Sequence, residues 1–148
     1  MLLFLDFDGV MHPSFCVEQN FFCRGALFAD AMREHPGASI VISSSWRHFH
    51  SLEELCAFFP ADIAARIIGT TKQSDSRPRH EEILDYLGDC SGLHISWVAL
   101  DDSRFEFPAR CPNLILCDGR VGLTEVDVTR LHNLIHGLTG GQGEACDR

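Results

Sequence analysis

Two pairs of aspartates are the residues of this sequence best suited to chemistry. Asp6 and Asp8 are two positions apart and directly follow an apolar run. Asp101 and Asp102 are adjacent and also follow an apolar run. Carboxylates held close together raise one another's pKa, so such a cluster normally requires a cation. Carboxylate oxygens are ligands that Mg²⁺ prefers, and Mg²⁺ also neutralises a transferring phosphoryl group, so the pattern predicts a magnesium site for phosphoryl transfer.

Gly9 allows the first pair of aspartates to take different roles. Residues two apart in a straight strand face the same side, but the permissive backbone of Gly9 lets the chain turn just after Asp8. Asp6 can then face the phosphorus while Asp8 reaches the oxygen of the leaving group. On this interpretation Asp6 is the nucleophile and Asp8 transfers the proton.

Short apolar runs alternate with segments of helical periodicity, which predicts crossover connections and a mainly parallel sheet. The expected fold class is α/β, a Rossmann-like three-layer α/β/α sandwich with about five strands. The expected strands are residues 2–5, 38–42, 66–69, 95–100 and 113–117. The expected helices are residues 24–35, 50–59, 79–88 and 124–136.

The expected sheet would bring the polar residues together. Three of the apolar runs stop at a polar cluster, and the carboxyl ends of parallel strands share one edge, beyond which ligands bind. The aspartates and the hydroxyls of residues 43–45 should therefore converge there. Residues 10–23 lack a clear period and are expected to form a loop or small hairpin at the same edge.

The chain is expected to form one domain over residues 1–137, followed by a flexible tail over residues 138–148. A length of 148 residues with 45% hydrophobic residues suits one compact core. Thr124 and Asp127 approximate a capping box at the start of the last helix. Seven cysteines without a paired Cys-x-x-Cys spacing are typical of reduced thiols in a cytoplasmic protein, and no apolar segment is long enough to cross a membrane.

The charge of the chain limits its partners. A net charge of −9 argues against binding long runs of nucleic-acid backbone, which requires neutralising Lys and Arg, but it is compatible with a small or terminal phosphate. The basic residues gather in two groups, for which substrate contact and solvated loop charges are equally good interpretations. These groups are Arg47, His48 and His50, and Lys72, Arg77, Arg79 and His80.

The segment from Asp6 to Val10, Asp-Phe-Asp-Gly-Val, resembles the first motif of the haloacid dehalogenase-like (HAD) phosphohydrolases. The resemblance implies that Asp6 forms an aspartyl-phosphate and that Asp8 acts first as acid and then as base. It also implies that both residues take part in binding Mg²⁺, Asp8 through its backbone carbonyl.

The second family motif is a Ser or Thr at the end of an apolar strand. Ser43, Ser44 and Ser45 are the candidates, and Ser44 is favoured by its similarity to Thr-Ser-Trp forms of the motif. Its hydroxyl would hydrogen-bond the phosphoryl group. The alternative for these serines is to cap the next helix, a role that suits Ser45.

The third family motif is a Lys or Arg near the start of a helix, where it steadies the nucleophile and the phosphate. Arg79 is favoured over Lys72 and Arg77, and the alternative for Arg79 is an ordinary surface residue at a helix start.

The fourth family motif resembles the segment from Trp97 to Ser103, an apolar strand that ends in paired acids. The resemblance implies that Asp102 ligates Mg²⁺ directly. It also implies that Asp101 supports the ion through a bridging water or through a hydrogen bond to one of its ligands. Four motifs in family order make the resemblance specific.

The spacing of the motifs leaves no room for a cap domain, so the site should be open to large substrates or covered by a partner. The Ser-Ser-Ser-Trp-Arg and Leu-Asp-Asp-Ser segments most closely resemble small HAD domains associated with RNA-repair proteins. That resemblance implies that Arg47 binds a terminal phosphate. For Trp46, packing is favoured over base stacking; His12, His48 and His50 are accessible candidates for substrate contact, with solvated loop histidines as the default.

The function expected is a Mg²⁺-dependent phosphatase that acts on a phosphomonoester, with an RNA or DNA end or another large molecule among the substrates. Two alternatives remain open. One is a regulatory module that binds metal or phosphate without turnover, and the other is a phosphotransferase that passes the phosphoryl group to an alcohol. The intact Asp6 and Asp8 count against the first, and the lack of a cap to exclude water counts against the second.

Overall fold

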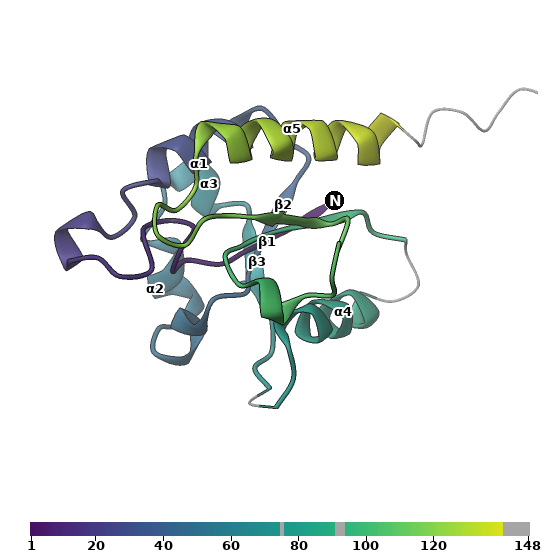
Figure 1. Cartoon of the computed structure of the whole chain (residues 1–148), viewed down its shortest axis with the longest axis horizontal. Coiled ribbons are helices and arrows are strands. Elements are labelled where there is room, and N and C mark those ends of the chain that lie inside the picture. The colour runs from purple at the N-terminus through teal and green to yellow at the C-terminus, as the bar shows by residue number, and fades with distance from the viewer. Residues whose placement is uncertain (75, 91–93, 141–148) are drawn as a thin grey trace, which may run out of the picture.

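Five strands form one sheet in the order β3-β2-β1-β4-β5, and every pairing is parallel (Figure 1). The structure is a computed structural model that describes residues 1–74, 76–90 and 94–140. All five expected strands are present, with ends that differ by one or two residues. The strands are β1 (Leu2–Leu5), β2 (Ser39–Ile42), β3 (Ile67–Thr70), β4 (Trp97–Asp101) and β5 (Leu114–Leu116).

Helices cover both faces of this sheet. In Figure 1, α1, α3 and α5 lie above the sheet and α4 lies below it. Three short 3₁₀ turns, η1 (Glu18–Asn20), η2 (Ser45–His48) and η3 (Arg104–Glu106), occupy loops that follow β1, β2 and β4. The helices are α1 (Gly25–Arg33), α2 (Leu52–Cys56), α3 (Ala61–Ala64), α4 (Arg79–Asp89) and α5 (Glu125–Gly140).

The side chains of β1 alternate between two hydrophobic cores. Leu3 and Leu5 belong to the larger core, which also contains residues of α1, α2, α3 and α5. Leu2 and Phe4 belong to a smaller core with Ile83 of α4. This period of two is the geometry of a strand buried on both faces, and it confirms the predicted three-layer α/β/α sandwich.

Two expected helices differ from the structure. The helix predicted at residues 50–59 is shorter in the structure, where α2 ends at Cys56, and a second short helix that was not predicted, α3, follows with Pro60 as its N-cap. Proline has no N–H and fixes its own φ, so it suits the start of a helix better than its interior.

The last helix is longer than predicted. Thr124 N donates to Asp127 Oδ2 over 3.0 Å and Asp127 N donates to Thr124 Oγ1 over 3.3 Å, so the predicted capping box is present. Helix α5 then continues to Gly140, so residues 138–140 are helical rather than part of the predicted tail. The rest of that predicted tail, residues 141–148, lies outside the described residues.

The strand order creates a switch point beside β1. The chain passes from β1 to β2 and β3 on one side, and then returns to β4 and β5 on the other. Leu5 pairs with both Ile42 and Leu100, so the residues that follow β1 and β2 and those that end β4 lie level at one edge. Ligands of open α/β sheets bind at this kind of position.

Two further sequence predictions concern membranes and cysteines. Within the described residues, no helix combines the length and the apolar character that a membrane crossing requires. Each cysteine in the described part of the chain is a free thiol.

Candidate active site

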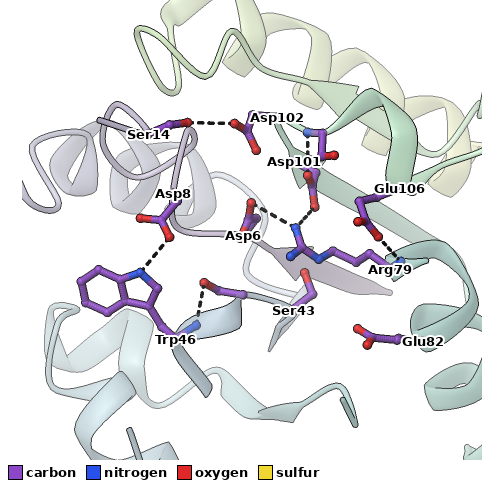
Figure 2. A network of polar contacts seen from close by, with 12 residues as sticks. Asp6, Asp8, Ser14, Ser43, Trp46, Arg79, Glu82, Asp101, Asp102 and Glu106 are labelled. Carbon is purple, nitrogen blue, oxygen red and sulfur yellow. Dashed lines mark hydrogen bonds and ion pairs between the residues drawn. The ribbon is translucent and has the colours of Figure 1, made fainter. Parts of the chain in front are cut away.

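Three of the four predicted aspartates meet at the switch point. One carboxylate oxygen from each of Asp6, Asp101 and Asp102 lies within 4.8 Å of the other two. Asp6 and Asp101 are buried, and Asp102 is partly exposed. The carboxylate of Asp8 does not belong to this group, and Figure 2 shows it turned toward Trp46.

Arg79 joins the two strands that carry the cluster. Its Nη1 lies 3.1 Å from Asp6 Oδ2 and 2.6 Å from Asp101 Oδ2 (Figure 2). Arg79 is the first residue of α4, and its backbone N donates to Glu106 Oε2 over 2.7 Å, which satisfies one free N–H of the helix start. Arg79 is thus held at its backbone by Glu106 and at its guanidinium by Asp6 and Asp101.

The other two basic candidates do not reach the cluster. Lys72 Nζ lies 3.1 Å from Asp89 Oδ2 on the surface. Arg77 pairs with Glu81 and Asp85 on the exposed side of α4. Of the three candidates for the third motif, the structure brings only Arg79 to the aspartates.

The acids of the cluster carry more negative charge than Arg79 balances. Burial raises the pKa of Asp6 well above its usual value, the neighbouring Asp101 adds to this, and Arg79 opposes it. Burial likewise raises the pKa of Asp101 against the opposing effect of Arg79. Burial lowers the pKa of Arg79, but the two acids outweigh it and the net shift is upward. Buried carboxylates that are only partly neutralised fit a divalent cation with oxygen ligands.

Two glycines and a serine shape the space around Asp102. Gly9 has a φ of +78°, and a Cβ there would lie 2.1 Å from Asp102 Oδ2. A Cβ on Gly119 would lie 2.3 Å from the same oxygen, and Ser14 Oγ donates to it over 2.9 Å. Neither Ser14 nor Gly119 was identified from the sequence as a site residue. The signal available was the turn-forming Asp118-Gly119 pair, which follows the last expected strand at the same edge.

Two ring N–H groups hold the carboxylate of Asp8. Trp46 Nε1 donates to Asp8 Oδ2 over 3.1 Å, and His12 Nε2 lies 2.9 Å from Asp8 Oδ1. Phe22 N donates to His12 Nδ1 over 3.3 Å, so Nδ1 is the acceptor and Nε2 carries the proton that reaches Asp8. The expectation that His12 is accessible is wrong. Its side chain is buried within the loop after β1, where it packs against the rings of Phe21 and Phe22.

Ser44 has the capping role that was expected of Ser45. Ser44 is the N-cap of η2, and its Oγ accepts a hydrogen bond from Trp46 N over 3.3 Å. Ser45 is instead the first residue of η2. The turn therefore starts one residue earlier than expected.

Ser43 occupies the position directly beyond β2. Its N–H donates to the carbonyl of Leu5 over 2.9 Å, so Ser43 lies level with Asp6 at the end of the neighbouring strand.

Arg47 connects the turn after β2 to α4. Its Nη1 donates to the carbonyls of Ser43 and Ser44 over 2.9 and 2.6 Å, and its Nη2 donates to Glu82 Oε2 over 2.8 Å. Burial lowers the pKa of Arg47, and Glu82 opposes that change. All three contacts are with groups of the protein itself, so Arg47 connects the backbone of Ser43 and Ser44 to Glu82.

Two small pockets flank η2 and share Ser45. The first, which we call the aromatic pocket, has a volume of about 240 Å³ and is lined by Asp8, Ser45, Trp46, Phe49 and His50. The second, which we call the polar pocket, has a volume of about 180 Å³ and is lined by Ser45, Arg47, His48, Gln73, Ser74, Arg77, Arg79, Glu82 and Glu106.

Larger cavities lie away from the aspartates. One of about 500 Å³ lies at the opposite end of the sheet beside Met1 and His35, and one of about 600 Å³ lies beside β5 and Phe105. Neither is lined by any of the four aspartates. The chemistry of the acid cluster, rather than cavity size, therefore identifies the candidate site.

No cap domain covers this edge in the part of the chain that the structure describes. The residues between β2 and α4 form η2, α2, α3 and β3, and those between β1 and β2 form a loop, η1 and α1. These segments belong to the layers of the sandwich or to its loops, and Asp102 of the acid cluster is partly exposed.

The match to a known family is consistent with this geometry. Residues 2–128 match the family described as HAD domain in Swiss Army Knife RNA repair proteins. No curated protein and no solved structure gives a significant match. The family match covers most of the chain and includes all four motifs, so it confirms the resemblance drawn from those residues. The chain therefore belongs to the family of HAD domains in Swiss Army Knife RNA repair proteins.

Proposed function

We propose that this chain is a Mg²⁺-dependent phosphohydrolase that cleaves phosphomonoesters through an aspartyl-phosphate on Asp6. The observation that carries the proposal is the position of Asp6 at the switch point, in contact with Arg79 and within 4.8 Å of an oxygen from each of Asp101 and Asp102. A nucleophilic carboxylate requires nearby positive charge both to remain ionised and to accept a phosphate dianion.

The proposed reaction has two steps. A carboxylate oxygen of Asp6 attacks phosphorus, and the bond to the leaving-group oxygen breaks as Asp8 gives that oxygen a proton. Asp8 then takes a proton from water, which attacks the phosphorus of the aspartyl-phosphate and releases inorganic phosphate. The hydrogen bonds from Trp46 and His12 hold the carboxylate of Asp8 away from the acid cluster. Each oxygen keeps a second lone pair, which can carry the proton that is given to the leaving group.

The donors for the metal and the phosphate come from the same edge. Asp6 and Asp102 would hold Mg²⁺, with Asp101 beside them and the backbone carbonyl of Asp8 as a further oxygen ligand. The ion would neutralise charge on the phosphoryl group. We assign Ser43, rather than the sequence-favoured Ser44, to the phosphoryl group, because Ser43 lies level with Asp6 directly beyond β2, whereas Ser44 is the N-cap of η2.

The proposed substrate is a phosphomonoester at the end of a nucleic-acid strand. The family to which the chain belongs is described by its occurrence in RNA repair proteins, and residues 1–74, 76–90 and 94–140 form no cap that would exclude a long chain. The net charge of −9 favours contact with a short terminal stretch over contact with an extended backbone.

Phosphate release from a panel of phosphoesters tests the reaction. The panel contains glycerol phosphate, nucleotides and oligonucleotides phosphorylated at the 3′ or 5′ end, each measured with Mg²⁺ and with EDTA. We expect Mg²⁺-dependent release from the wild-type protein, its loss in Asp6→Asn, and its retention in Asp89→Asn, which changes an exposed acid paired with Lys72. Release that survives in EDTA or in Asp6→Asn would contradict the proposal.

The same assays distinguish the alternative functions. Binding of Mg²⁺ and beryllofluoride without phosphate release from any substrate would favour a module that binds phosphate without turnover. Consumption of the phosphoester that rises with an added alcohol, without a matching rise in free phosphate, would favour a phosphotransferase.

A further inference from the structure

The aromatic pocket lies on the leaving-group side of the proposed reaction. Asp8 forms part of its wall. If Asp8 protonates the leaving-group oxygen, as proposed above, whatever is attached to that oxygen must extend from Asp8 into or across this pocket. The inference below therefore rests on the proposed function, and it concerns the chemistry of the leaving group.

Three of the five residues that line this pocket are aromatic or heteroaromatic: Trp46, Phe49 and His50. The rings of Trp46 and His50 are nearly parallel, with centroids 5.5 Å apart and an angle of 24° between their planes. Trp46 is held by its bond to Asp8, so the aromatic wall has a fixed position relative to the proposed acid. Such a wall suits a planar ring on the ligand.

Phe49 is exposed in a way that its packing does not explain. Its side chain is 82% exposed, although burial of a phenylalanine is favourable by about 1.5–3 kcal/mol. Single exposed apolar residues are common on protein surfaces and mean little by themselves. Phe49 differs from the equally exposed Phe15 and Phe105 because it shares a pocket with Asp8.

The polar pocket on the other side of η2 has a different chemistry. Among its lining residues are three arginines, Arg47, Arg77 and Arg79, and two acids, Glu82 and Glu106. These charged groups are paired: Glu82 with Arg47, Glu106 with the backbone N–H of Arg79, and Arg77 with Glu81 and Asp85. A ring-binding pocket and an arginine-lined pocket that meet at Ser45 match the alternation of base and phosphate along a nucleic-acid strand.

We propose that the aromatic pocket receives the terminal base of an unpaired nucleic-acid strand whose end phosphate is hydrolysed. Its volume of about 240 Å³ is below the ~300–1,000 Å³ of pockets that enclose drug-sized ligands, so it suits one base. A base within a duplex is stacked and paired, and it cannot enter such a pocket without leaving the helix. A single strand presents its terminal base directly, and the ring of Phe49 stacks on it.

Kinetics with matched variants test this assignment. The substrates are a terminally phosphorylated single strand, the same end in a blunt duplex, a phosphotyrosine peptide, and glycerol phosphate as a reference without a ring. We expect Phe49→Ala to raise KM for the single strand by roughly fivefold to a hundredfold, and Phe49→Tyr to preserve it. Phe105→Ala, whose ring is 94% exposed and lies outside the aromatic pocket, should leave that KM unchanged.

Several outcomes would overturn the proposal. These are a duplex end that is hydrolysed as well as the single strand, a phosphotyrosine peptide that is preferred to it, and equal effects of Phe49→Ala and Phe105→Ala. Hydrolysis of glycerol phosphate separates the two levels of the argument. If it is metal-dependent and requires Asp6 while the Phe49 variants behave as wild type, the proposed reaction stands and the base assignment fails.

A binding measurement tests the assignment without turnover. Fluorescence anisotropy of a labelled, terminally phosphorylated single strand is followed with Asp6→Asn in Mg²⁺. Adding Phe49→Ala should weaken binding by the same roughly fivefold to hundredfold, and adding Phe105→Ala should not. Equal binding by all three proteins would contradict the proposal.

Discussion

Trp46 Nε1 donates a hydrogen bond to Asp8 Oδ2 over 3.1 Å, which connects the turn after β2 to the loop after β1. The indole also packs edge-to-face on Phe7, Phe21 and Phe22. Trp46 therefore combines the packing role favoured from the sequence with a role in orienting Asp8.

Trp46→Phe should lower kcat by about tenfold with little change in KM for glycerol phosphate. The variant keeps an aromatic ring but removes a hydrogen bond to a carboxylate, and such bonds are worth about 1.5–3 kcal/mol. Steady-state kinetics give the measurement. Trp97→Phe, at the other tryptophan in the chain, provides the control, because that residue lies on β4 and packs on Phe4. An unchanged kcat in Trp46→Phe would show that the bond does not orient Asp8.

Arg79→Met should destabilise the metal-free protein by about 3–5 kcal/mol, because it leaves two buried carboxylates without their cationic partner. Urea unfolding in EDTA measures this loss, and added Mg²⁺ should recover part of it by binding the folded state. Arg77→Met is the control, since its ion pairs are exposed and their removal should change the unfolding midpoint very little. Equal unfolding midpoints for the two variants in EDTA would contradict the prediction.

Gly119→Ala should lower Mg²⁺ affinity by about tenfold to a hundredfold, as loss of a group that positions a metal ligand commonly does. The new Cβ would lie 2.3 Å from Asp102 Oδ2 and 2.9 Å from Ser14 Oγ, so the carboxylate must move. Isothermal titration with Mg²⁺ measures the affinity. Gly37→Ala has no atom within 4 Å of its new Cβ and should bind as wild type. Unaltered affinity in Gly119→Ala would mean that Asp102 does not hold the ion.

The free energy of unfolding should fall as the pH is lowered below about 6.5, partly because of His35. Burial lowers the pKa of His35, the neighbouring His132 and His136 lower it further, Glu34 opposes them, and Arg66 adds a small lowering effect. The unfolded chain therefore binds more protons than the folded protein between the lowered pKa and about 6.5, and stability rises with pH across that window.

Urea unfolding at pH 7.5 and pH 5.5 measures this dependence for the wild type and His35→Gln. We expect a smaller difference between the two pH values in the variant, because glutamine does not titrate. An equal difference in both proteins would show that other groups cause it.

Much of the fold could be predicted from local patterns. The runs around Phe4, Val41 and Ala99 are apolar without interruption, as strands buried on both faces must be, and all five expected strands are present. The end of α2 at Cys56 was missed, because the apolar spacing continues through residue 59, and the short helix α3 after Pro60 was not predicted.

The site could be predicted best where its residues end a strand or follow it directly. Asp6, Asp101 and Asp102 do so, and their meeting is a consequence of parallel strands that end at one edge. Contacts such as Ser14 to Asp102 join residues 88 positions apart, and a pattern of neighbouring residues cannot predict such a contact. The burial of His12 likewise depends on how the loop after β1 folds, because its fold brings Phe21 and Phe22 against the imidazole.

The amino-acid sequence by itself determined the strands, the family and the identity of the acids, because hydrophobic periodicity and strand-end chemistry are local properties. Only the tertiary structure decided which basic residue reaches the acids, which serine caps η2 and what holds Asp8. Those outcomes depend on the directions in which loops leave the sheet. Arg79 and Ser44 each have alternatives of the same chemical type nearby in the chain, and packing in three dimensions selects among them.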